Sequence, residues 1–165
     1  MSARIKLADI AATQALAEQV APLLQVGDCL LLYGDVGLGK TSFTRFLIGA
    51  MQHKPEEVTS PTFTLVQPYR VSLANGALIN LHHYDLYRLE SPAELEELGF
   101  EESVETGIAV VEWPEKALDY LPKDAVKISF EAGPCEQARE IHIEAPDDWS
   151  DRMQLLLEGW KSHAA

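Results

Sequence analysis

Residues 34–41 read GDVGLGKT and directly follow the apolar run CLLLY. They fit the pattern G-x-x-x-x-G-K-[ST], with Gly34, Gly39, Lys40 and Thr41 at its fixed positions. Glycines let successive backbone N–H groups turn inward around an anion, and the start of a following helix adds positive potential. Lys40 would then reach the β and γ phosphates of a nucleotide, and the Thr41 hydroxyl would bind Mg²⁺. The spacing therefore predicts a phosphate-binding loop rather than an ordinary glycine turn.

A magnesium site at such a loop requires an acidic side chain at the tip of a neighbouring strand. Glu112 follows the apolar run IAVV, whereas Asp85 follows the more polar run LINLHHY. Because ligands bind at the carboxyl edge of a parallel sheet, we expect Glu112 to be the metal ligand. Asp85 would bind Mg²⁺ through water or orient the attacking water. Which of the two is the direct ligand stays open, and both could also be solvated carboxylates at strand ends.

Three ring-bearing residues, His82, His83 and Trp113, are close in sequence to Asp85 or Glu112. His82 and His83 are adjacent on the expected strand and point to opposite faces, so they cannot readily hold one metal ion together. We expect structural or supporting roles for them. Trp113 either stacks near a nucleotide or packs under the strand end.

The loop requires a strand before it and a helix after it, and the sequence supplies both. Residues 29–33 form an apolar run without alternation, which is typical of a strand covered on both faces. Residues 41–51 place apolar side chains at helical spacing. Three further helices are expected: one over 9–24 capped by Asp9, one over 92–98 ended by Gly99, and a closing helix from Trp149. The other expected strands lie at 63–67, 69–73 and 78–82, with a type I′ turn at Asn75-Gly76. A second buried strand is expected at 108–111, followed by strands at 126–130 and 141–143.

These elements predict an α/β fold similar to that of P-loop NTPases, a three-layer sandwich whose central parallel strands are flanked by antiparallel strands. The chain has 165 residues and is 47% hydrophobic, which suits a single domain over residues 1–165. Its net charge of −13 argues against a broad nucleic-acid-binding surface, so any RNA would be held by a partner. The longest apolar run is too short to cross a bilayer, and the start lacks the apolar core of a signal peptide. We therefore expect a cytoplasmic protein.

The ordered set of motifs resembles the bacterial TsaE (YjeE) family, whose members are P-loop ATPases needed to make threonylcarbamoyladenosine beside the anticodon of tRNA. The similarity covers nearly the whole chain. The loop alone occurs in many ATPases, kinases and GTPases, but the set is specific. It consists of GDVGLGKT at 34–41, SPTFTLV at 60–66, HHYDLYRL at 82–89, ELEELG at 94–99 and VEWPEK at 111–116.

This resemblance implies a weak, Mg²⁺-dependent ATPase that acts with two partner proteins, TsaB and TsaD, and contacts tRNA only through them. It implies catalytic roles for Lys40 and Asp85, and a γ-phosphate-sensing role for Thr62 in the SPT segment. It also implies that Thr41 and Glu112 bind the magnesium ion. The residues implied to contact the nucleotide are Asp9 and Thr13 near the base, then Gly34, Asp35, Val36, Gly37, Leu38, Gly39, Lys40, Thr41 and Ser42 in and after the loop, and Trp113.

Two positions depart from the family pattern. Ala138 replaces the glycine that usually precedes arginine, here Arg139, which weakens any nucleotide-binding role for Ala138. Leu38 replaces a small loop residue and leaves the loop glycines intact.

Other functions remain open from the residues alone. A small-molecule kinase shares the loop, but no arginine cluster typical of a kinase lid is visible in the sequence. A GTPase would carry an N-K-x-D guanine motif, and none is present. A nucleotide-dependent binding module without meaningful turnover would carry the same loop, and would be distinguished by retaining its function when Asp85 is replaced.

Overall fold

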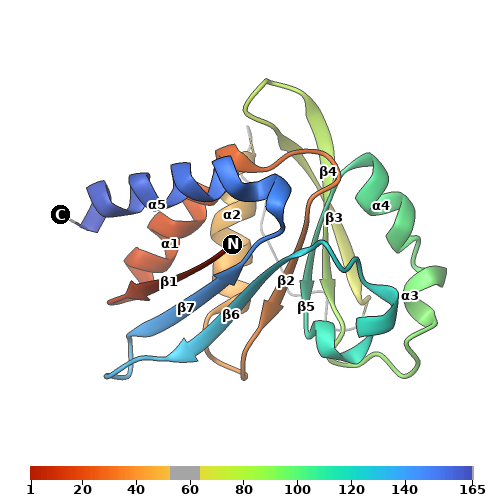
Figure 1. Ribbon diagram of the computed structural model, residues 1–165. Helices are drawn as coiled ribbons and strands as arrows, with labels where there is room; N and C mark the ends of the chain where they lie inside the picture. Colours follow the sequence, from red (N-terminus) through yellow and green to blue (C-terminus); the bar gives the residue numbers. More distant parts are fainter. Residues whose placement is uncertain (53–63, 165) are drawn as a thin grey trace.

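The computed structural model describes residues 1–52 and 64–164, and a seven-stranded sheet in the order β1-β7-β6-β2-β5-β4-β3 runs through it (Figure 1). Strands β6, β2, β5 and β4 are parallel neighbours, and antiparallel strands complete both edges. The predicted α/β fold, with central parallel strands between antiparallel ones, is confirmed. The strands are β1 (Ser2–Leu7), β2 (Cys29–Tyr33), β3 (Val66–Ser72), β4 (Leu78–Asp85), β5 (Ile108–Glu112), β6 (Val126–Ala132) and β7 (Arg139–Glu144).

Helices cover both faces of the sheet and make three layers (Figure 1). Because side chains alternate along a strand, Leu30 and Leu32 pack with three helices on one face, while Leu31 packs with two shorter helices on the other. The first face carries α1 (Ile10–Val20), α2 (Lys40–Met51) and α5 (Ser150–Ala164), and the second carries α3 (Glu94–Glu97) and α4 (Phe100–Thr106). None of the helices in the described ranges has the length and apolar character of a membrane span.

The antiparallel edge at β3 differs from the expectation in two ways. The part of the expected strands that is described forms one strand through Pro68, which is tolerated because β3 is the edge strand of the sheet. The hairpin to β4 is present, but its turn is not type I′: Gly76 N–H donates to Leu73 O and Gly76 has φ +85°, whereas Asn75 has no positive φ. Phe63, the first residue of the expected strand, lies outside the described residues.

Two further elements differ from the expectation. Strand β1 was not expected; it pairs with β7 and buries only Ile5 and Leu7 on alternate positions, a pattern too short to stand out in the sequence. Gly99, expected only as a helix stop, has φ +70° and separates α3 from a second helix, α4.

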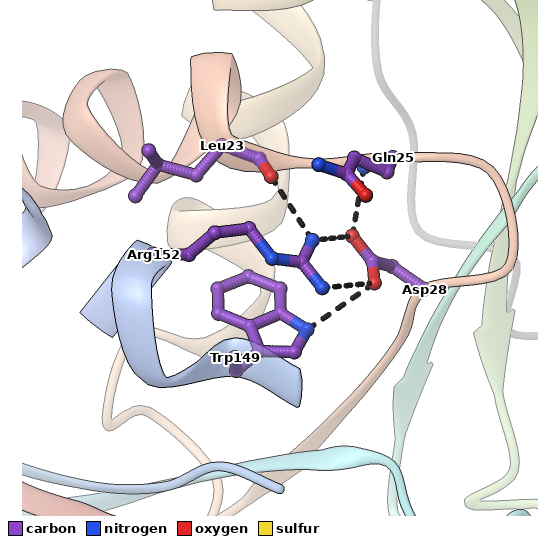
Figure 2. A network of polar contacts seen from close by, with 5 residues as sticks. All are labelled: Leu23, Gln25, Asp28, Trp149 and Arg152. Carbon is purple, nitrogen blue, oxygen red and sulfur yellow. Dashed lines mark hydrogen bonds and ion pairs between the residues drawn. The ribbon is translucent and has the colours of Figure 1, made fainter. Parts of the chain in front are cut away.

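A buried ion pair fastens α5 to the amino end of β2 (Figure 2). Asp28 accepts hydrogen bonds from Arg152 Nη1 and Nη2 at 2.6 and 3.2 Å, from the Gln25 N–H at 2.7 Å, and from the Trp149 indole at 3.2 Å. Arg152 also donates to Leu23 O and stacks its guanidinium 3.9 Å from the centre of the Trp149 ring. Every Asp28 oxygen is thus paired, so this buried charge is fully compensated.

Candidate functional site

The glycine-rich loop connects β2 to α2 at the carboxyl end of the parallel strands. Gly34 leaves β2 with φ +138°, and a Cβ there would lie 2.7 Å from the Phe130 carbonyl oxygen. Gly39 has φ +105° and forms the N-cap of α2. The loop therefore needs glycine at both positions, one for close approach to β6 and one for the turn into the helix. The loop leads directly into the N-terminus of α2, whose positive potential favours bound anions.

Lys40 opens α2, and its side chain is held inside the site. Its ammonium donates to Gly34 O and lies 3.5 Å from the centre of the Trp113 ring, a cation–π contact. Only 4% of Lys40 is exposed. Burial lowers the pKa of Lys40, and nearby carboxylates, Glu112 most strongly, offset part of this effect.

Thr41, Glu112 and His83 form a short chain of contacts beside the loop. Thr41 Oγ1 donates to Glu112 Oε1 at 2.8 Å, and His83 Nε2 lies 2.5 Å from Glu112 Oε2. His83 is fully buried and Glu112 is 2% exposed. Because an ionised carboxylate can only accept, and His83 Nδ1 has no hydrogen-bond partner among the described residues, we infer that His83 donates its Nε2–H to Glu112. Both Glu112 oxygens are therefore oriented by neighbouring side chains.

Asp85 ends β4, directly opposite Glu112 in the parallel register of β4 and β5. Asp85 Oδ1 accepts the Tyr87 N–H at 3.1 Å, and the Tyr87 ring lies 5.0 Å from that of Trp113. Asp85 is 7% exposed, so the polar run before it does not form a solvated strand. The run before Asp85 alternates between exposed and buried side chains at its start, unlike the fully buried β5, and becomes buried at its carboxyl end, where β4 lies between β5 and β3.

Two cavities lie on either side of the loop. One, of about 480 Å³, is lined by Val36, Gly37, Gly39, Lys40, Thr41, Ser42, Asp85, Tyr87, Glu112 and Trp113. The other, of about 450 Å³, is lined by Ile10, Thr13, Gly37, Leu38, Gly39, Ser42, Glu136, Gln137 and Arg139. Gly37, Gly39 and Ser42 border both, so one extended ligand could cross the loop from one cavity to the other.

The structure thus brings most of the sequence-predicted residues together. Lys40, Asp85, Glu112 and Trp113 border one cavity, and Thr13 and Leu38 border the other. Asp9 borders neither of these two: its Oδ1 accepts the Ala12 N–H at 3.0 Å and caps α1. Gly34 and Asp35 lie at the base of the loop, where Gly34 O receives the Lys40 ammonium and Asp35 O accepts the Leu38 N–H. Thr62 and its SPT segment lie outside the described residues.

Arg139 is a functional candidate that the sequence reasoning did not single out. From the start of β7 its guanidinium donates to Leu38 O at 3.1 Å and to Gly37 O at 3.2 Å, with further bonds to Glu136 O and Ala138 O. It therefore holds two carbonyl groups of the loop in place. The signal in the sequence is its position in the Ala138-Arg139 pair, which corresponds to the Gly-Arg of the family pattern and to which no role was assigned.

The side chains at the mouth of the loop suit a magnesium ion. The Thr41 hydroxyl and the Glu112 carboxylate are hard oxygen donors already in contact, and Asp85 ends the next strand. No group of three or more His, Cys, Asp or Glu side chains in the described part of the chain forms a complete metal cage. Mg²⁺ takes few protein ligands and fills its remaining positions with water and phosphate oxygens, so the two oxygen donors of Thr41 and Glu112 could hold it.

Comparison with known proteins agrees with this architecture. Residues 7–141 match the family model described as "Threonylcarbamoyl adenosine biosynthesis protein TsaE". A protein of Bacillus subtilis named "tRNA threonylcarbamoyladenosine biosynthesis protein TsaE" is 34% identical over 153 residues, which are 92% of this chain and 89% of that protein. A protein of the same name from Rickettsia conorii is 39% identical over 120 residues, 73% of this chain and 66% of that protein, slightly less than two thirds of its length.

A solved structure has a similar fold. The structure titled "Crystal structure of Bacillus subtilus YdiB" superposes with a TM-score of 0.74 at 28% identity, covering 100% of this chain and 97% of that one.

Proposed function

The chain belongs to the TsaE family, and from this premise we propose that it is a magnesium-dependent ATPase acting in the biosynthesis of threonylcarbamoyladenosine in tRNA. The relatives named above carry that pathway in their names. The observation that best supports a nucleoside triphosphate with Mg²⁺ as the ligand is the contact of Thr41 with Glu112 beside the buried Lys40. Thr41, Glu112 and Lys40 line one cavity, which supports the proposal that a metal ion and phosphates bind there side by side.

In this proposal the loop amides and the N-terminus of α2 receive the phosphates, and Lys40 moves from Gly34 O and the Trp113 face onto the β and γ oxygens. Thr41 and Glu112 would hold Mg²⁺, which would supply positive charge that neutralises the phosphates. Asp85 lies opposite Glu112 and orients the attacking water toward the γ-phosphate. We place the base near Thr13 in the second cavity, reached across the loop.

We further propose that the protein acts with TsaB and TsaD, and that tRNA is bound by those partners. A net charge of −13 supports this division, because a strongly acidic protein repels the phosphate backbone of RNA. The same composition is compatible with the cytoplasmic setting in which tRNA is modified.

Reconstitution of the modification tests the proposal. ATP turnover and adduct formation on tRNA are measured with TsaB, TsaD and the threonylcarbamoyl donor enzyme, in the presence of the wild-type chain, its Lys40→Ala variant or no chain. We expect multiple-turnover modification only with the wild-type chain. Modification that continues unchanged without it would overturn the pathway assignment. A phosphorylated metabolite formed in step with ADP would instead favour a kinase.

Asp85→Ala separates hydrolysis from binding. We expect this variant to retain ATP binding, because Lys40 and the loop amides remain, and to lose turnover. A variant that hydrolyses ATP normally would refute the role of Asp85. Loss of turnover without loss of tRNA modification would indicate a nucleotide-dependent binding module.

A further inference from the structure

A large groove lies outside both cavities of the candidate site. It has a volume of about 1030 Å³ and lies between α3 and α4 on one side and the 3₁₀ turn η3 (Leu118–Tyr120) on the other. We call it the α4 groove. Figure 1 shows these elements together on the side of the sheet away from α1 and α5.

The floor of the α4 groove is apolar. Leu95, Phe100 and Leu121 line it and are buried, which ties the floor to the core under this face of the sheet. At its border Tyr120 is 39% exposed, and Leu118 in the same turn is 54% exposed. Apolar side chains thus continue from the core to the surface, as at sites where a partner side chain is buried.

The rim of the α4 groove carries only negative charge. Its lining includes five exposed carboxylates and no Lys, Arg or His: Glu96, Glu101, Glu102, Glu105 and Asp119. None of the five forms an ion pair with another residue in the described ranges. Their repulsion is uncompensated within this part of the chain, so a cationic ligand would relieve it.

The α4 groove is built by the two chain segments that leave the candidate carboxylates. The segment after Asp85 leads to α3 and α4, and the segment after Glu112 leads to η3. The two segments contact one another where they begin, since Leu86 N–H donates to Glu112 O at 3.1 Å. An occupant of the groove would therefore rest on both segments that carry the site.

We propose that the α4 groove docks a segment of a partner protein that presents Lys or Arg side chains together with apolar ones. The cations pair with the acidic rim, and the apolar side chains cover the floor beside Tyr120. Nucleic acid is excluded because its phosphates would meet five carboxylates. A second copy of this acidic chain is disfavoured for the same electrostatic reason.

Binding of a synthetic peptide tests the proposal. The probe is a fluorescently labelled amphipathic peptide with lysines on one face and leucines on the other, and its affinity for the full chain is measured by fluorescence anisotropy. The groove variant carries Glu101→Lys and Glu105→Lys. The matched control carries Glu18→Lys and Glu158→Lys, two exposed glutamates of α1 and α5 on the other face of the sheet, and has the same net charge.

We expect the groove variant to bind the peptide about tenfold more weakly than the control does, because each lost surface ion pair contributes modestly and the two reversals add repulsion. Tyr120→Ser should also weaken binding, because the Tyr120 ring lines the groove, while leaving the folded spectrum intact because this side chain is already 39% exposed. Equal loss of affinity in the groove variant and the control would show attraction by net charge alone and overturn the proposal. An unchanged affinity in the groove variant would overturn it as well.

The proposal does not depend on the ATPase assignment, because the groove residues do not border the nucleotide cavity. MgATP affinity is measured on the same variants and should be unchanged. Failure of peptide docking with normal MgATP binding would therefore count against the groove alone.

Discussion

Replacing His83 by alanine tests how the proposed metal ligand is held. The His83 ring is fully buried and its Nε2 lies 2.5 Å from Glu112 Oε2, so the variant removes one of the two side chains that orient this carboxylate. Thr41 remains as the other. A hydrogen bond to a charged group contributes about 1.5–3 kcal/mol, and loss of a partner that orients a ligand typically lowers metal affinity by about 10–100-fold. We therefore expect Mg²⁺ affinity in the nucleotide complex to fall within that range.

The assay titrates Mg²⁺ at a fixed concentration of a fluorescent ATP analogue and records the Mg²⁺ concentration at half-saturation. Nucleotide affinity in EDTA should change little, because Lys40 and the loop amides are untouched. His83→Gln restores a donor at this position and should recover part of the loss. The matched control is His82→Ala, since the neighbouring ring points to the other face of β4, where its centre lies 6.4 Å from that of the Tyr84 ring. Equal Mg²⁺ half-saturation in His83→Ala, His82→Ala and the wild type would refute the reasoning.

Three further predictions concern the loop and the fold. Arg139→Ala should weaken ATP binding about tenfold in calorimetry, because two carbonyl groups of the loop lose their hydrogen-bond donor. A wild-type affinity for ATP in this variant would contradict the prediction and show that the loop keeps its shape without Arg139. Arg152→Ala should lower the free energy of unfolding by about 3 kcal/mol in urea, because Asp28 is left buried without a counter-charge and keeps only the neutral donors of Gln25 and Trp149. Arg4→Ala removes two exposed ion pairs, each worth less than about 1 kcal/mol, and equal losses in the two variants would contradict this. Burial lowers the pKa of Lys40, and bound phosphates would raise it again, so ATP binding at alkaline pH should take up a proton and should weaken as the pH rises. Calorimetry in buffers of different ionisation enthalpy measures this proton uptake. ATP binding without proton uptake at any pH would refute the prediction.

The central strands and the loop were predictable because their signals are local. The run at β2, the glycines and the first turn of α2 follow one another in the sequence, and Glu112 is marked by the apolar run before it. The predicted proximity of Asp85 and Glu112 to the loop followed from the shared edge of parallel strands, and the register of β4 and β5 places them side by side.

The remaining features depend on residues far apart in the chain. Arg139 contacts Leu38 across 101 positions, and Arg152 contacts Asp28 across 124, so no pattern within either segment predicts the pairing. From the sequence, His83 could be assigned only a general supporting role. Its contact with Glu112 depends on which strands are neighbours in the sheet, and residue spacing along the chain does not reveal this. The groove likewise arises only when two segments separated in sequence meet on one face.

The central claim is that the loop, Lys40 and the Thr41–Glu112 pair bind a nucleoside triphosphate together with Mg²⁺. Isothermal titration of ATP into the wild-type chain and into Lys40→Ala, each with Mg²⁺ and with EDTA, tests it most directly. We predict tight binding to the wild type that weakens in EDTA, and a loss of about 100-fold or more in Lys40→Ala, the size expected for a charge-assisted phosphate contact in a buried site. ATP affinity that is the same in both chains, and indifferent to Mg²⁺, would contradict it.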